Sequence, residues 1–411
     1  MKQKKIFLLT PFLIVFLLLM PLHSFAESER PDDLYSETFV IMDAVTGKVL
    51  AENDADRRMY PASITKIVTG ILAIESGRMD EQVTISGNAV RVDGTRVYLV
   101  EGEQMSLRQL VQGLMINSGN DAAIAIAEHL SGSVEEFSKE MNALVKDRLG
   151  LEGTHFVNPS GLYEDDHYTT AADMARITQY ALENKEFREI VGTKKMDWIG
   201  KSWETTLYNH HKLLWRYDGT FGVKNGYTNQ SQHTLVTAAT KEDTSLIVVT
   251  MKSDTSEQAY SDTTELLNYG FDHFETKKLE KGTVYVDENG NEYTLKEDKF
   301  FTVKIGETYE TMVNEEGTLL VHTDTDEEIA SFPLLPDTKQ VMDEEPAEAV
   351  MGKVEVDETE KNGFSWVSIL FGGLIILFLL AVIRWYRVKK KRKQKRLRME
   401  RMKDEIHRFR R

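Results

Sequence analysis

A serine and a lysine lie three residues apart at the start of a predicted buried helix. Ser63 and Lys66 follow Pro61, which suits a helix entry, and apolar residues then recur every three or four positions up to Ile74. Side chains three apart share one helical face, so the hydroxyl and the amine can reach each other. The helix N-terminus also favours the negative charge that develops when a serine attacks a carbonyl. The pair could therefore act as nucleophile and base.

Two more stretches strengthen this hypothesis, because a Ser-x-x-Lys tetrad alone is as well explained by a helix start with a surface lysine. Ser118 and Asn120 follow an apolar segment and open an alanine-rich one, and Lys224 stands two residues before Gly226 in a strand-like context. In this order the three motifs resemble the set of penicillin-binding proteins and serine β-lactamases.

Longer blocks narrow the resemblance to the low-molecular-mass D-alanyl-D-alanine carboxypeptidases, over about residues 31–274. These blocks are residues 60–70, 117–123, 158–162, 169–175 and 266–271. The resemblance implies an α/β sandwich with an antiparallel sheet and a helical cluster, followed by a small all-β domain. It also implies a serine peptidase that removes the terminal D-alanine from peptidoglycan stem pentapeptides and is acylated by β-lactam antibiotics.

The resemblance assigns a role to each motif residue. Ser63 would be the nucleophile, Lys66 the base and Ser118 a proton relay, with the backbone N–H groups of Ser63 and Tyr227 as the oxyanion hole. A free lysine titrates near pH 10.4, so Lys66 needs burial and a second cation, Lys224, to be neutral near pH 7. The implied substrate-binding residues are Asn120, Lys224, Asn225, Gly226, Tyr227 and Thr228.

One position departs from the family pattern, which has threonine where this chain has Asn225. Asparagine is longer and lacks the hydroxyl that would meet the substrate carboxylate. The loss of one charge-assisted hydrogen bond corresponds to about 1.5 to 3 kcal/mol. We therefore expect a slower enzyme rather than an inactive one.

Two other functions compete with the carboxypeptidase. A class A β-lactamase needs a glutamate with an asparagine four residues later, and no glutamate between Asp121 and Lys224 has one. The second alternative is a catalytically weakened protein of the same fold that binds peptidoglycan and signals or scaffolds. Asn225 and the uncharged, membrane-spanning stretch expected at residues 364–383 favour it, whereas retention of the serine and lysine motifs opposes it.

The remaining segments must place these motifs together. Residues 39–42 and 48–51 read as a hairpin, and residues 106–115, 122–130, 134–149, 170–182 and 263–274 have helical spacing. Residues 221–228, 234–240 and 245–252 are rich in β-branched residues and read as strands. Helices bracketed by strands from both ends of the segment indicate an α/β sandwich in which the two ends share one sheet.

Composition excludes several kinds of chemistry. The chain has 411 residues and no cysteine, so disulfides and thiol chemistry are impossible. Its histidines form no His-Glu-x-x-His pattern, and we expect neither a metal nor a cofactor.

Both ends of the chain indicate a membrane protein. Residues 1–26 read as a cleaved signal peptide, residues 364–383 form an uncharged stretch long enough to span a bilayer, and the basic tail is expected in the cytoplasm. The tail contributes +12 and the signal +3 to a net charge of −16, so the part between them carries −31, which argues against a nucleic-acid partner. The expected domains are the signal (1–26), the catalytic domain (27–274), a small β domain (275–335), an acidic linker (336–363), the transmembrane helix (364–383) and the tail (384–411).

Overall fold

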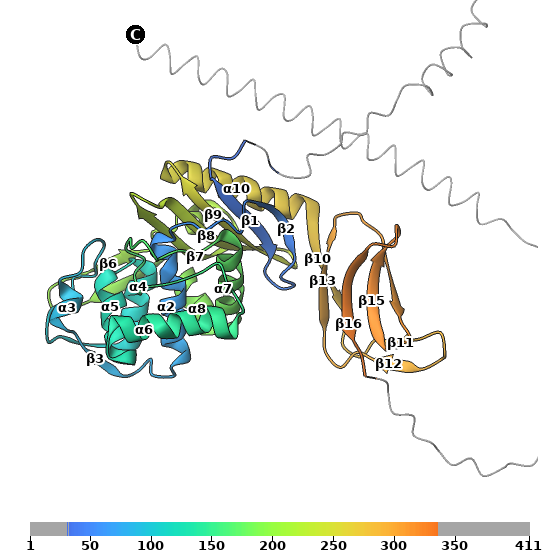
Figure 1. Cartoon of the computed structure of the whole chain (residues 1–411), viewed down its shortest axis with the longest axis horizontal. Helices are drawn as coiled ribbons and strands as arrows, with labels where there is room; N and C mark the ends of the chain where they lie inside the picture. The colour runs from blue at the N-terminus through green and yellow to red at the C-terminus, as the bar shows by residue number, and fades with distance from the viewer. Residues whose placement is uncertain (1–30, 32, 336–411) are drawn as a thin grey trace, which may run out of the picture. The chain divides into compact units, whose positions relative to one another are not determined.

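The central element is a five-stranded antiparallel sheet (Figure 1). The computed structural model describes residue 31 and residues 33–335. In spatial order the strands are β2 (Val49–Asn53), β1 (Thr38–Asp43), β9 (Thr244–Ser253), β8 (Gln232–Lys241) and β7 (Thr220–Thr228). Strand β1 pairs with β9 across its whole length, which confirms the prediction that the two ends of this segment share one sheet.

Helices cover both faces of the sheet, because alternate strand residues point to opposite sides. Ile41 and Val248 pack with the apolar side chains of α10 (Ser256–His273), whereas Val40 and Val249 belong to the core under the other helices. Figure 1 shows α10 on one side of the sheet and the helical cluster on the other. The α/β sandwich is therefore confirmed.

The helical cluster carries the first two motifs. Residues 62–65 form a 3-10 turn, so Ser63 stands one turn before α2 rather than inside it, and Lys66 is the first residue of α2. The helical elements of the cluster, which include a 3-10 and a π segment, are Ala62–Thr65 (η1), Lys66–Glu75 (α2), Gly87–Val90 (α3), Leu107–Ile116 (α4), Asn120–Ser131 (α5), Val134–Asn142 (α6), Ala143–Arg148 (η2), Ala171–Glu183 (α7), Lys185–Gly192 (α8) and Leu213–Arg216 (α9).

Two features differ from the sequence-based expectation. Helix α10 begins at Ser256, not at residue 263, because Thr255 and Gln258 form a capping box that starts it earlier. Two short antiparallel strand pairs were not predicted: Gln82–Thr84 (β3) with Gln104–Ser106 (β4), and Lys195–Ile199 (β5) with Glu204–Tyr208 (β6).

Short strands follow α10 and enclose a core of their own. Their buried side chains include Leu295, Phe301 and Leu319. The strands are Phe274–Leu279 (β10), Val284–Val286 (β11), Glu292–Thr294 (β12), Lys299–Lys304 (β13), Tyr309–Val313 (β14), Thr318–Thr323 (β15) and Glu328–Pro333 (β16). The prediction of short strands in this region is confirmed.

Several expected segments lie outside the described residues: the signal peptide, the acidic linker, the membrane span and the basic tail. Within residues 33–335, no helix is both long and apolar enough to cross a membrane.

Candidate active site

The turn that carries Ser63 is fixed from two sides. Thr234 on β8 donates its hydroxyl proton to the carbonyl oxygen of Pro61 at 2.8 Å. On the other side Gly161 has a φ of +81°, and a Cβ there would lie 1.8 Å from the carbonyl oxygen of Ala62. Only glycine fits this close approach, so the loop after η2 and strand β8 together hold the nucleophile turn.

Lys66 contacts the first motif, the second motif and the loop that contains Ser160, to which the sequence analysis gave no role. Its Nζ lies 2.9 Å from Oγ of Ser63, 2.7 Å from Oδ1 of Asn120 and 2.6 Å from the carbonyl oxygen of Ser160. Its side chain is fully buried. The amide and carbonyl oxygens can only accept hydrogen bonds, whereas the serine hydroxyl can donate.

The electrostatics favour an uncharged Lys66. Burial, followed by the positive charge of Lys224, lowers the pKa of Lys66 well below that of a free lysine, and Asp121 partly opposes this change. Burial also lowers the pKa of Lys224, to about 7. A neutral Lys66 donates two N–H bonds to Asn120 and Ser160 and directs its lone pair at Ser63, which is the arrangement of a general base.

The second motif lies where α5 begins. Ser118 is buried and has a φ of +62°, and Asn120 is the first residue of α5. Asn120 Nδ2 donates to the carbonyl oxygen of Asp93 at 2.7 Å, next to Gly94. Within residues 33–335, Ser118 makes no side-chain hydrogen bond, so its predicted relay role stays a prediction.

A buried carboxylate next to the motif orders the loop between α3 and β4. Asp121 accepts hydrogen bonds from the backbone N–H groups of Val97 at 3.0 Å and Leu99 at 3.1 Å. Burial raises the pKa of Asp121, and these backbone donors oppose that rise. The sequence analysis missed this role, although an acidic residue in the first turn of a helix was a readable signal.

Asn158 shapes the loop that meets Lys66. Its Oδ1 accepts from the N–H groups of Ser160 at 3.2 Å and Gly161 at 2.8 Å, and its Nδ2 donates to the carbonyl oxygen of Leu162 at 2.9 Å. The turn thereby points the Ser160 carbonyl at the Lys66 amine.

His167 joins the same loop to the nucleophile turn without adding charge. Its Nδ1 accepts from the backbone N–H of Val157 at 3.1 Å, so Nε2 carries the proton and donates to Thr65 Oγ1 at 2.9 Å. Burial first, and then the charges of His155 and Lys66, lower the pKa of His167 to about 3. The ring is therefore neutral near pH 7.

Strand β7 brings the third motif to the nucleophile. A Cβ on Gly226 would lie 2.7 Å from the backbone nitrogen of Ser63, so the glycine allows direct approach of the strand to the turn. Lys224 is buried on this strand and donates to the carbonyl oxygen of Asn225 at 3.0 Å. Tyr227 is 52% exposed, and the Thr228 hydroxyl forms a hydrogen bond of 2.8 Å with the Ser231 hydroxyl at the end of the strand. All three predicted motifs thus converge.

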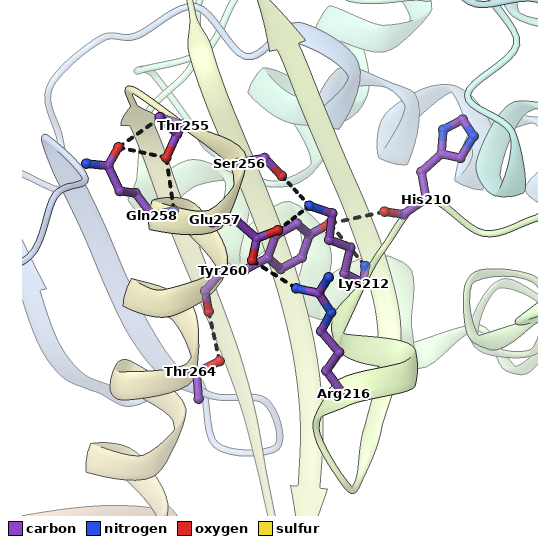
Figure 2. Close-up of polar contacts among 9 residues, drawn as sticks. All are labelled: His210, Lys212, Arg216, Thr255, Ser256, Glu257, Gln258, Tyr260 and Thr264. Carbon is purple, nitrogen blue, oxygen red and sulfur yellow. Dashed lines mark hydrogen bonds and ion pairs between the residues drawn. The ribbon is translucent and has the colours of Figure 1, made fainter. Parts of the chain in front are cut away.

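Helix α10 supports the segment that contains His210 and Lys212, as Figure 2 shows. Tyr260 donates its hydroxyl proton to the carbonyl oxygen of His210 at 3.1 Å and accepts from the backbone N–H of Lys212 at 3.1 Å. The Lys212 ammonium also pairs with Glu257 at 2.7 Å. Partial burial and then the charge of Lys224 lower the pKa of His210 to about 4, so its ring adds no second charge near pH 7.

Comparisons with known proteins agree with this geometry. A family model described as D-alanyl-D-alanine carboxypeptidase matches residues 25–255. D-alanyl-D-alanine carboxypeptidase DacF of Bacillus subtilis is 35% identical over 264 residues, which cover 62% of this chain and 67% of that protein. DacA of Haemophilus influenzae is 33% identical over 300 residues, covering 68% of this chain and 75% of that protein.

Solved structures show the same fold. Penicillin-binding protein 5 from Haemophilus influenzae superimposes with a TM-score of 0.66 at 30% sequence identity, and the match covers 75% of this chain and 98% of that protein's chain. Penicillin-binding protein 6B from Escherichia coli superimposes with a TM-score of 0.64 at 27% identity, and the match again covers 75% of this chain and 98% of the other. The fold and site thus define a penicillin-binding-protein-like serine hydrolase. The chain belongs to the D-alanyl-D-alanine carboxypeptidase family and is a serine peptidase.

Proposed function

We propose that this protein removes the C-terminal D-alanine from peptidoglycan stem pentapeptides through an acyl-enzyme on Ser63. The observation that carries the proposal is the 2.9 Å contact between Ser63 Oγ and the amine of Lys66, whose other two partners can only accept hydrogen bonds. This contact makes a neutral lysine the base for the serine.

Acylation begins when Ser63 passes its proton to the lone pair of Lys66 and its Oγ attacks the carbonyl carbon of the penultimate D-alanine. The N–H groups of Ser63 and Tyr227 stabilise the resulting oxyanion. The protonated Lys66 then returns the proton, with Ser118 as relay, to the nitrogen of the departing D-alanine. The C–N bond breaks and the acyl group stays on Ser63 as an ester.

Substrate recognition falls to the third motif and Asn120. Lys224, in its charged form, attracts the terminal carboxylate of the peptide, and Asn225 contacts the same group. Gly226, Tyr227 and Thr228 offer the backbone edge of β7, an outer strand of the central sheet, for pairing with the extended peptide. Water then hydrolyses the ester with Lys66 as base.

β-Lactam antibiotics should acylate the same serine, because their strained amide presents a carbonyl to the nucleophile beside a carboxylate. The test incubates the full-length protein with a labelled penicillin and maps the labelled peptide by mass spectrometry. We expect label on Ser63 in the native protein and none in Ser63→Ala. Label on another residue, or none in a folded native protein, would contradict the proposal.

The alternative of a non-catalytic signalling or scaffold protein is not favoured. It would not need a buried lysine with a lowered pKa in contact with a serine hydroxyl, since such a group destabilises the folded state. Turnover is the simplest reason to retain it.

We infer the placement in the cell from the sequence alone. Residues 1–26 are a cleaved signal peptide, and the catalytic domain (27–274), the small β domain (275–335) and the acidic linker (336–363) lie outside the membrane. Residues 364–383 span it once, because they carry no charge, and the basic tail (384–411) stays in the cytoplasm. Protease added to intact cells should remove the outer part and spare the tail; digestion of the tail would contradict this topology.

A further inference from the structure

A cationic hollow lies at the far end of the proposed substrate strand. It has a volume of about 320 Å³, and its lining includes Arg57, Arg58, Tyr60, Tyr168, Gln230 and Lys252. Tyr60 stands three residues before the nucleophile, and Gln230 belongs to the turn between β7 and β8. We call this cavity the upstream hollow.

The direction of a bound peptide leads into the upstream hollow. The proposed function places the terminal carboxylate of the peptide at Lys224 and the scissile carbonyl at the N–H of Tyr227. The residues that precede the scissile bond therefore extend along β7 toward the C-terminal end of the strand. Gln230 is three residues beyond Tyr227. At about 3.3 Å per residue this distance is about 10 Å, so the hollow receives residues one to three positions upstream of the scissile bond.

The charges of the hollow do not cancel. Arg57 and Lys252 both pair with one carboxylate, Glu37, at 2.8 and 2.9 Å. Two cations on one carboxylate leave a positive charge for a ligand. This excess stands out on a chain with a net charge of −16.

Arg58 is the cation best placed to bind an anion. Its guanidinium lies over the ring of Tyr168, 4.4 Å from the centroid, and one nitrogen donates to the carbonyl oxygen of Glu152 at 3.4 Å. Asp165 is the one acidic residue that lines the hollow, and it accepts a hydrogen bond from the Tyr163 hydroxyl. The contact with the ring holds the guanidinium in place, and its other N–H groups are available for bidentate binding of a carboxylate.

We propose that the upstream hollow is a subsite for a carboxylate carried by the stem peptide upstream of the scissile bond, with Arg58 as its main partner. The inference rests on the proposed function and adds a specificity to it: an anionic stem peptide is preferred over a neutral one. A γ-linked glutamate with a free α-carboxylate is the matching chemical group, and its α-amide is the neutral counterpart.

The test compares two pentapeptides that differ only in this group, acetyl-L-Ala-γ-D-Glu-(acetyl)Lys-D-Ala-D-Ala and its α-amide. The quantity compared is the ratio of kcat/KM for the carboxylate peptide to kcat/KM for the amide peptide. For the full-length native protein this ratio should be about five, because a partly exposed charge pair contributes about 1 kcal/mol. Arg58→Gln should bring the ratio close to one. Arg58→Lys, which keeps the charge but not the fork, should lie between the two.

Controls separate this inference from the proposed function. Lys139→Gln removes an exposed cation on α6 and should leave the ratio unchanged. Added salt should lower the native ratio by screening. Equal kcat/KM values for both peptides, or a ratio that Arg58→Gln does not change, would overturn the subsite alone. Absence of Ser63-dependent release from either peptide would instead overturn the proposed function, and the subsite with it.

Discussion

The amine of Lys66 lies 2.9 Å from the hydroxyl of Ser63, and three separate segments of the chain hold it there. Asn120 comes from the start of α5, Ser160 from the loop after η2, and Lys66 itself from the start of α2. The catalytic contact therefore depends on packing between distant segments, and changes in the supporting residues should alter the chemistry without unfolding the protein.

Asn158→Ala should lower kcat/KM about tenfold or more. Asn158 makes the hydrogen bonds that orient the Ser160 carbonyl. Their loss should raise the activation free energy by about 1 to 2 kcal/mol, which corresponds to a factor of about ten in rate. Asn158→Asp keeps the acceptor and loses only the bond to Leu162, so it should be less affected. The readouts are kcat/KM, its pH profile and the unfolding temperature. A loss of activity with an unchanged pH profile would contradict the link to Lys66.

Gly226→Ala should lower the rate of acylation by penicillin, because the new Cβ would lie 2.7 Å from the Ser63 nitrogen and 2.6 Å from Thr234 Oγ1. Either the strand or the nucleophile turn must shift, which disrupts the oxyanion hole and should reduce the rate about a hundredfold or more. Gly192→Ala, with its nearest contact at 3.2 Å, is the matched control and should stay active. Normal acylation in Gly226→Ala would show that the close approach of β7 is not required.

Much of this site was predictable from the sequence, because the chemistry-bearing side chains of all three motifs were visible as residue types at fixed spacings. The structure brings Ser63, Lys66 and Asn120 together by hydrogen bonds and places Gly226 against the nucleophile. The sheet was predictable for a similar reason, since its buried strands have a strong β-branched pattern.

Other parts gave no readable signal. The carbonyl groups of Asp93 and Ser160 hold the motif side chains, and a backbone acceptor has no residue type that would reveal it. The hairpin of β5 and β6 buries mainly Trp198 and Leu207, so its alternation is too weak to detect. The early start of α10 depends on a polar capping box, not on apolar spacing.

Asn225→Thr should increase kcat/KM for a D-Ala-D-Ala peptide, by up to about a hundredfold if one charge-assisted hydrogen bond is restored. Within residues 33–335, the Asn225 side chain makes no hydrogen bond, so the exchange removes none. A peptide with an amidated C-terminus lacks the carboxylate and should show no gain. Equal rates for native and variant protein on the free acid would show that asparagine serves as well as threonine.

Lys224→Met should be inactive yet more stable than the native protein near pH 7. The pKa of Lys224 is about 7 in the folded state, whereas an unfolded lysine titrates near 10.4, so the unfolded state binds more protons between these values. The free energy of unfolding therefore rises with pH across this window, and the full penalty, on the order of a few kcal/mol, applies below pH 7. Thermal unfolding at pH 7 and 9.5 measures it, and the advantage of the variant should shrink at the higher pH. A variant less stable at both values would contradict this account of the buried amine.

The most direct test of the central claim measures D-alanine release from diacetyl-Lys-D-Ala-D-Ala by the full-length protein and by Ser63→Ala. The predicted result is D-alanine release by the native protein and a loss of release by about a thousandfold or more in Ser63→Ala, with an unchanged unfolding temperature. Release that persists in Ser63→Ala, or no release by a folded native protein, would contradict a carboxypeptidase that acts through an ester on Ser63.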